Sequence, residues 1–172
     1  EKYIEHISYE KDWMDLKIEE LIINEYNLDL GGRKRFSSPL IKIQKLNFDI
    51  FRDKTVKDDV REKDMYSKMV RDLDFGIHID SIHIASSYLR YGEQLQKPGP
   101  PATIFFEDFN VGVSNVTNLD LEREDFPYTN VEIKTQFMGK SALNFNWSFK
   151  VNDTLDRFTV KGSGYGISDT SV

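Results

Sequence analysis

The sequence contains no cysteine. Disulfide bonds, thiol nucleophiles and zinc sites built from thiolates are therefore excluded. Positive charge is also scarce, because 23 Lys and Arg residues stand against 29 Asp and Glu residues, which gives a formal net charge of -6. Binding to a nucleic-acid backbone requires a basic face. Nucleic acid is therefore not expected as a partner.

Long apolar runs are missing as well. No stretch approaches the ~20 residues of a membrane-spanning helix, and the sequence does not open with a secretory leader. The chain begins at Glu1 rather than at a methionine and stops at Val172, soon after a strand-like run. We therefore expect a piece of a longer protein, with any targeting segment removed, in which residues 1–172 form a single β-rich domain.

Aromatic residues and a two-residue apolar period dominate what is present. Aromatics make up 13% of the chain, with 12 Phe and 8 Tyr, and these residues favour strands. Apolar residues at every second position are typical of a strand with one buried face. The alternating segments are residues 16–30, 41–50, 77–91, 104–113, 131–137, 143–149 and 158–162. We predict a mainly β fold, a curved and bulged antiparallel sheet that is groove-like or sandwich-like, without parallel strands.

The apolar alternation slips by one residue at several points. Such a slip requires a turn or a bulge, because otherwise the apolar side chains would change faces. The slips fall at Gln44–Lys45, at Asp80–Ser81, between Ile84 and Leu89, and at Glu107–Asp108. The sequence therefore predicts bends at these positions and a strongly curved, twisted sheet.

Residues 59–72 have a different pattern. Good helix formers follow several acidic residues, and Met65, Met69 and Leu73 are spaced i, i+4, i+8. This spacing predicts a short helix near residues 59–72 with a narrow apolar stripe, laid over one end or edge of the sheet. The alternative use of such a methionine pair is an adaptable ligand surface.

Residues with catalytic or metal-binding chemistry do not form a recognisable site. His78 and His83 are five residues apart, with Asp74 and Asp80 nearby, but polar sheet faces carry such groups by chance. The sequence has neither a serine nucleophile elbow nor a phosphate-binding P-loop. No carboxylate pair suggests acid–base work. We predict no catalytic residues, no metal ligands and no cofactor, and expect that the protein is not an enzyme.

The apolar side of the predicted sheet is the candidate binding surface. Its candidate members are Ile104, Phe106, Phe109, Val111, Ile133, Phe137, Leu143, Phe145, Trp147 and Phe149. A curved sheet must cover such a face with a second layer or with a ligand. A lipid chain contributes about 0.8 kcal/mol per buried methylene. Two alternatives stay open: an acyl-chain groove and the closed core of a sandwich.

Four stretches, in this order, carry a resemblance to a known family. They are Ile50-Phe51-Arg52-Asp53-Lys54, then Ile79-Asp80-Ser81-Ile82-His83-Ile84 leading to Tyr91-Gly92-Glu93, then Ile104-Phe105-Phe106-Glu107-Asp108-Phe109 leading to Asn115-Val116-Thr117-Asn118, and Met138-Gly139 through Leu143-Asn144-Phe145 to Phe158-Thr159-Val160-Lys161-Gly162. Over residues 16–166 the chain resembles the AsmA/TamB-like superfamily, in particular the AsmA-like periplasmic proteins of Bacteroidetes-type Gram-negative bacteria.

The resemblance implies a repeating β-groove protein. Such proteins are anchored in the inner membrane by an N-terminal helix, project into the periplasm and carry phospholipid acyl chains toward the outer membrane. We therefore expect a non-enzymatic envelope segment that binds lipid acyl chains, with the membrane anchor outside these 172 residues. The alternative is a structural or protein-interaction module with a closed β core, which packs on partner domains or self-associates, for example by strand addition.

Overall fold

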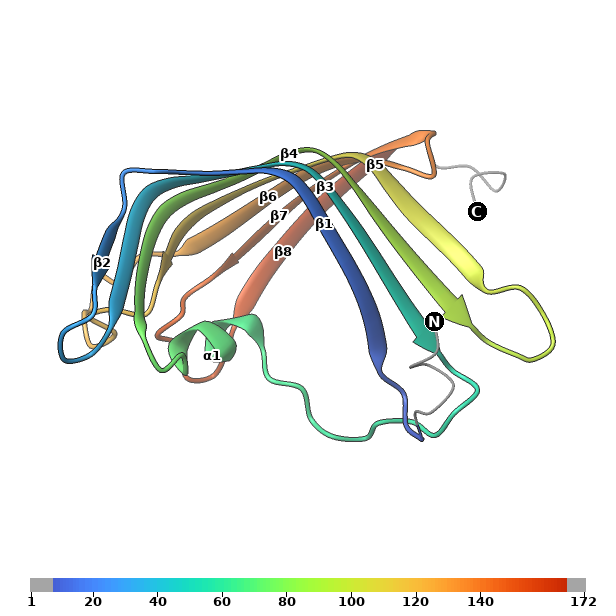
Figure 1. Ribbon diagram of the computed structural model, residues 1–172, viewed down its shortest axis with the longest axis horizontal. Coiled ribbons are helices and arrows are strands. Elements are labelled where there is room, and N and C mark those ends of the chain that lie inside the picture. The colour runs from blue at the N-terminus through green and yellow to red at the C-terminus, as the bar shows by residue number, and fades with distance from the viewer. Residues whose placement is uncertain (1–7, 167–172) are drawn as a thin grey trace.

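The computed structural model describes residues 8–166, so the remainder of the single domain predicted for residues 1–172 lies outside the described part. The chain forms one open sheet and one short helix (Figure 1). The strands are β1 (Asp12–Asn24), β2 (Asn27–Asp29), β3 (Arg35–Asp53), β4 (Gly76–Gln94), β5 (Ala102–Thr117), β6 (Thr129–Phe137), β7 (Ser141–Phe149) and β8 (Phe158–Tyr165). Their order in the sheet is β1-β3-β4-β5-β6-β7-β8, and β2 pairs with β3. The predicted fold class, a curved, bulged and mainly antiparallel sheet, is confirmed.

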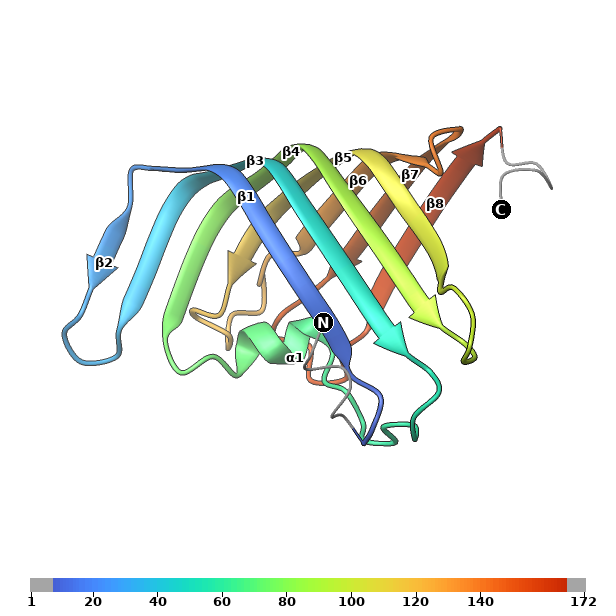
Figure 2. The ribbon, with the colours of Figure 1, turned by 45° about the vertical axis from the view of Figure 1, so that its right-hand side comes forward.

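The sheet is folded over into an arch (Figures 1 and 2). Strands β3, β4 and β5 rise along one wall, bend at the apex and descend the other wall. Each has one residue with positive φ at its bend: Lys45 (52°), Ser86 (51°) and Asp108 (46°). The pairing register shifts near two of them, around Ser87 and between Glu107 and Asn110. The bends predicted at Gln44–Lys45, between Ile84 and Leu89, and at Glu107–Asp108 are confirmed.

The change of face predicted at Asp80–Ser81 occurs without a shift of register. The exposed positions of β4 change there from His78 and Asp80 to His83. Ile79 pairs with Val116 and Ser81 with Ser114, so the register of β4 against β5 is unbroken there. The irregular residue at this level belongs to β5, where Asn115 has a φ of 57°. Asparagine tolerates this left-handed conformation better than most residues. The backbone irregularity therefore lies in the neighbouring strand.

The expectation of a sheet without parallel strands is wrong. Strands β3 and β4 run parallel, and residues 54–75 cross from the end of one to the start of the other. Parallel strands are usually recognised in a sequence as continuous apolar runs, because helices cover both of their faces. Here the inner face of the arch is the more apolar one, and the outer face is largely polar. These two strands therefore alternate like antiparallel ones, and their sequence gives no sign of their direction.

The helix α1 (Tyr66–Arg71) lies within the predicted range of residues 59–72 but is only six residues long. The predicted apolar stripe through Met65, Met69 and Leu73 is wrong, because Met69 is 54% exposed. The helix instead turns Ser67 and Val70 toward the sheet. Polar contacts with the β7–β8 loop fix this rotation.

Arg71 and Ser67 hold α1 against that loop. Arg71 Nη1 donates to the carbonyl oxygens of Val151 (2.6 Å) and Asp153 (3.1 Å), and Arg71 Nη2 lies 3.1 Å from Asp156 Oδ1. The Ser67 hydroxyl donates to the same Asp156 oxygen at 2.7 Å. The Arg71 and Asp156 side chains are only 16% and 19% exposed. This partly buried cluster ties the crossover segment to the far end of the sheet.

The cluster predicts an acid-sensitive part of the stability. The hydrogen bond from Ser67, followed by Arg71, lowers the pKa of Asp156 below its ordinary value of 3.8. A lowered folded-state pKa gives stability that is complete above the unfolded value and is lost as the pH falls through the folded value. We expect the free energy of unfolding of Asp156→Asn to fall less than that of the wild type between about pH 5 and about pH 3. Urea titrations at both pH values measure this, and equal losses would contradict the role of the Asp156 charge.

Candidate functional site

Directly paired residues of neighbouring strands point to the same face of a sheet. Two consecutive rows of such residues cross the sheet from β1 to β8. The first row is Ile23, Ile41, Ile82, Val113, Val131, Trp147 and Val160, and the second is Leu21, Ile43, Ile84, Val111, Ile133, Phe145 and Gly162. Apart from Gly162, every member is apolar. One face of the sheet is therefore continuously apolar across seven strands.

The apolar face continues beyond the apex of the arch. The next rows are Leu16, Phe48, Leu89, Phe106 and Phe137, and then Met14, Ile50, Tyr91 and Ile104. The Phe106 and Phe137 ring centroids are 5.5 Å apart, which places both rings on one face. Without the bends, these rows would point outward, because one residue of slip exchanges the faces of a strand. The bends keep one apolar surface on both walls.

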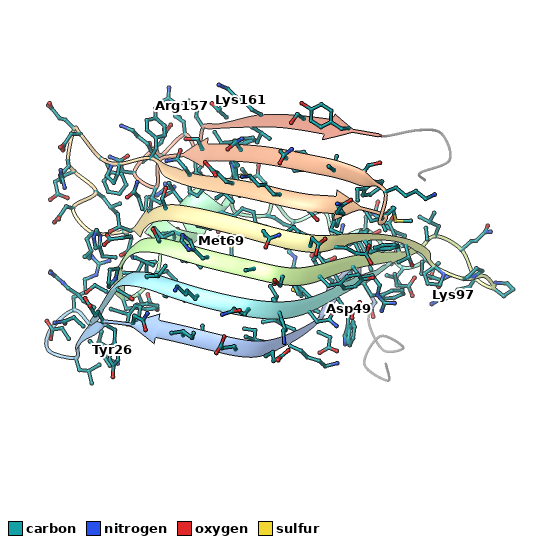
Figure 3. The ribbon with its side chains drawn as sticks, turned by 90° about the horizontal axis from the view of Figure 1, so that it is seen from above. Tyr26, Asp49, Met69, Lys97, Arg157 and Lys161 are labelled. Atoms are coloured by element: carbon teal, nitrogen blue, oxygen red, sulfur yellow. The ribbon has the colours of Figure 1, made fainter. Side chains whose placement is uncertain are left out.

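This apolar surface is the inner, concave side of the arch. Helix α1 lies inside the arch in both ribbon views (Figures 1 and 2). Trp147 of the first row meets Tyr66 of α1 edge to face, with ring centroids 5.3 Å apart. We call the four rows on this concave side the trough. The outer face is polar in the row Lys42, His83, Gly112, Glu132, Asn146 and Lys161, of which Lys161 is seen from above in Figure 3. On the other wall it also carries the stacked rings of Tyr88 and Phe105.

The structure brings together all ten residues predicted to form the apolar binding face. They lie on the trough side of three neighbouring strands, β5, β6 and β7: Ile104, Phe106, Phe109, Val111, Ile133, Phe137, Leu143, Phe145, Trp147 and Phe149. Only Val111 and Phe149 are buried, and the other eight are half-buried. The prediction missed the contribution of β1, β3 and β4, including Leu21, Ile41, Ile43, Ile82 and Ile84. The same alternation in residues 16–50 and 77–91 was the available signal.

The trough is covered at one end and open at the other. Phe126, Phe149 and Val151 are 2%, 5% and 0% exposed and form a closed cluster, against which Val70 of α1 and Trp147 pack. Toward β1 the apolar side chains stay accessible, and Leu16 and Leu21 are each 53% exposed. Residues 8–166 contain no second sheet that faces the trough. Its apolar surface is thus left for another molecule to cover.

A charged row ends the wall of the trough formed by β1, β3 and β4. Arg52 donates through Nε and Nη2 to both carboxylate oxygens of Asp12, at 2.6 and 2.7 Å. The hydrogen bond from Arg52 lowers the pKa of Asp12. In the next strand the Tyr91 hydroxyl donates to Glu93 at 2.9 Å. The apolar trough therefore has a polar, ion-paired rim, which suits an amphiphilic ligand.

The contact of the Phe145 ring with Gly162 of β8 gives a test of the packing in the trough. A Cβ added at Gly162 of β8 would lie 2.8 Å from the Phe145 ring, whereas a Cβ at Gly112, on the outer face of β5, would meet nothing within 4 Å. We expect Gly162→Ala to lower the free energy of unfolding by about 1–3 kcal/mol through overpacking. The matched Gly112→Ala is expected to raise it by about 0.4–1 kcal/mol. Chemical denaturation measures both, and equal stability of the two variants would show that Phe145 does not pack over β8.

The histidines do not form a common site. His78 Nε2 lies 3.1 Å from Asp80 Oδ1 at a half-exposed position, whereas His83 lies beside Gly112 on the outer face. Among residues 8–166 no three metal-ligating side chains gather in a way that would hold an ion. The single helix in this part of the chain is too short and too polar to cross a bilayer.

Comparison with models of known protein families and with curated proteins finds no match to this sequence. The geometry and chemistry of the trough are therefore the basis for a functional assignment.

Proposed function

We propose that this chain is a non-enzymatic segment of a cell-envelope protein that binds or conducts lipid acyl chains along the trough. The observation that carries the proposal is the apolar inner face, which is continuous across seven strands, half-buried on the central strands and exposed on the edge strands β1 and β8. A surface of this size without its own cover is typical of a ligand or partner site.

The dimensions and energetics of the trough fit an acyl chain. Neighbouring strands lie about 4.8 Å apart, so seven strands offer a path of about 29 Å across them. About ten seated methylenes would contribute about 8 kcal/mol of gross transfer free energy. The apolar rows and the polar Asp12–Arg52 rim match the two halves of a phospholipid. We place this activity in the periplasm, between the inner and the outer membrane, as the family resemblance implies.

Native mass spectrometry of the purified chain, combined with organic extraction, tests the proposal. We expect the wild type to retain phospholipid, or to take it up from added vesicles. A clean ligand-free mass after incubation with vesicles would overturn the acyl-chain assignment. Retention of detergent alone, with no phospholipid, would also count against it.

A second candidate function rests on the two open edges of the sheet. All eight residues of β8 are exposed, and one side of its backbone has no partner strand in the described sheet. Following the pairings across the sheet, β1 and β8 run antiparallel to each other. A second copy or a partner domain could therefore add its edge strand to β8 and extend the same apolar face.

Sedimentation over a concentration series distinguishes self-association through this edge. We expect oligomers that are lost in Val160→Lys, because an edge lysine opposes strand addition. A monomer at every concentration would reject self-association through β8 while leaving acyl-chain binding untouched.

A further inference from the structure

An open pocket of about 520 Å³ lies at the end of the β7–β8 hairpin. Ser148 and Thr159, which line it, pair directly with each other, and they alternate with the trough residues Trp147 and Val160. The pocket therefore opens on the outer face, opposite the trough. Arg157, another lining residue, lies at this end of the sheet (Figure 3).

The loop that forms the pocket is held from the inner side. Val151 is fully buried, and its carbonyl oxygen accepts a hydrogen bond from Arg71 at 2.6 Å. The Asn152 side chain donates to the carbonyl oxygen of Leu121 at 3.0 Å. The turn closes through the Asp156 amide, which donates to the carbonyl oxygen of Asp153 at 3.0 Å. These contacts fix the lining residues in place before any ligand arrives.

Two cations, Lys150 and Arg157, and one carboxylate, Asp153, line the pocket. The Lys150 ammonium lies 5.0 Å from the centre of the Tyr128 ring and forms no salt bridge with a carboxylate in residues 8–166. Arg157 donates through Nε to Asp153 Oδ2 at 2.7 Å, which leaves its two terminal nitrogens for other acceptors. The second carboxylate oxygen of Asp153 is also occupied, because Oδ1 accepts a hydrogen bond from the Leu155 amide at 3.0 Å.

The remaining charges and hydroxyls near the pocket favour an anion. Asp125, whose pKa is lowered by Arg123 and to a smaller extent by Lys150, is already paired with Arg123 at 2.8 Å. Thr154 and Thr159 line the pocket, and neither hydroxyl is used in a hydrogen bond within the described part of the chain. The pocket thus has a local excess of positive charge in a chain of net charge -6.

We propose that this pocket binds a phosphate group, with Lys150 and Arg157 supplying charge and the hydroxyls of Thr154 and Thr159 supplying further donors. Charge-assisted hydrogen bonds of this kind are the strong contacts to phosphate oxygens, and the terminal nitrogens of an arginine can contact two of them. Because the pocket and the trough lie on opposite faces, a lipid chain seated in the trough does not supply this phosphate. The source is either a soluble phosphate compound or the headgroup of a phospholipid in an adjoining membrane.

Titration with inorganic phosphate, followed by amide NMR at about 0.1 M salt, tests the pocket. We expect saturable shifts centred on residues 148–159, and an affinity at least about tenfold weaker in Lys150→Glu. The matched control is Lys42→Glu on the outer face of β3. It makes the same charge change four strands away, beyond the Debye length of about 10 Å, and should leave the affinity unchanged. Thr159→Val, which suits a strand and removes one hydroxyl, should weaken binding without lowering the melting temperature.

Vesicles of phosphatidylglycerol and of phosphatidylcholine distinguish the two sources. Binding of soluble phosphate assigns a soluble ligand, whereas Lys150-dependent binding to phosphatidylglycerol vesicles alone assigns a headgroup. Absence of both, or equal phosphate affinity of the wild type and Lys150→Glu, would overturn the proposal. Uptake of phospholipid into the trough should be the same in Lys150→Glu as in the wild type, so failure of the pocket and failure of the trough are separate results.

Discussion

Replacing Phe145 by Asp is expected to lower the affinity for phospholipid acyl chains by at least about a hundredfold, or about 2.7 kcal/mol. Phe145 lies in the second row of the trough, between Ile133 and Gly162. An aspartate there would remove the ring surface from a seated chain and place an unpaired carboxylate against its methylenes, which is costly for a charge. Native mass spectrometry with added phospholipid, or displacement of a fluorescent fatty acid, measures the loss.

Asn146→Asp is the matched control for this variant. It places the same charge on the same strand one residue away, but on the outer face. Its affinity for the acyl chain should equal that of the wild type. If Phe145→Asp stayed folded and still bound phospholipid normally, the chain would not run along the second row, and the trough assignment would fail.

Replacing Phe126 by Ala should produce the largest loss of stability, about 3–5 kcal/mol in the free energy of unfolding. Phe126 is 2% exposed and packs with Phe149 and Val151 in the one closed cluster of the described chain. Removing the ring leaves a cavity beneath α1, because the loop that carries Phe126 and the β7 strand are both fixed by other contacts. Urea denaturation followed by tryptophan fluorescence, to which Trp147 on the cluster contributes together with Trp13, reports the change.

Leu155→Ala serves as the control, because Leu155 lies in the β7–β8 loop with 73% of its surface exposed. Its effect should stay within about 0.5 kcal/mol. An equally small change in the free energy of unfolding for Phe126→Ala would mean that the cluster does not stabilise the end of the trough beside α1. The trough would then be open along its whole length.

The contacts around α1 also determine which end of the trough is closed. The cluster of Phe126, Phe149 and Val151 and the contacts of Arg71 close the trough beneath β7, while its β1 end stays accessible. If the trough binds lipid as proposed, we expect an acyl chain to enter from an exposed edge of the sheet such as β1. The same loop that Arg71 fixes from within forms the outer phosphate pocket, so both proposed sites depend on one rigid hairpin.

The sequence by itself determined the strands and the part of the trough that lies on β5, β6 and β7. A two-residue apolar period depends only on the geometry of an extended backbone, so it identified the face on which Ile133, Phe145 and Trp147 lie. The slips in that period located the bends at Lys45, Ser86 and Asp108, because a bulge is the only way to keep one apolar face continuous. The strand faces and the bends depend on neighbouring residues only, so the apolar period of the sequence is enough to predict them.

The tertiary structure alone decided which way strands run and what covers each face. The parallel pairing of β3 with β4 depends on a crossover of residues 54–75 that no periodicity encodes. The rotation of α1 follows from contacts of Ser67 and Arg71 with Asp156, more than 80 residues away. The predicted methionine stripe failed for this reason, since packing outweighs local pattern in a helix of six residues. Whether the apolar face is covered is likewise a property of distant segments, and only their arrangement leaves the trough open toward β1 and closed beneath β7.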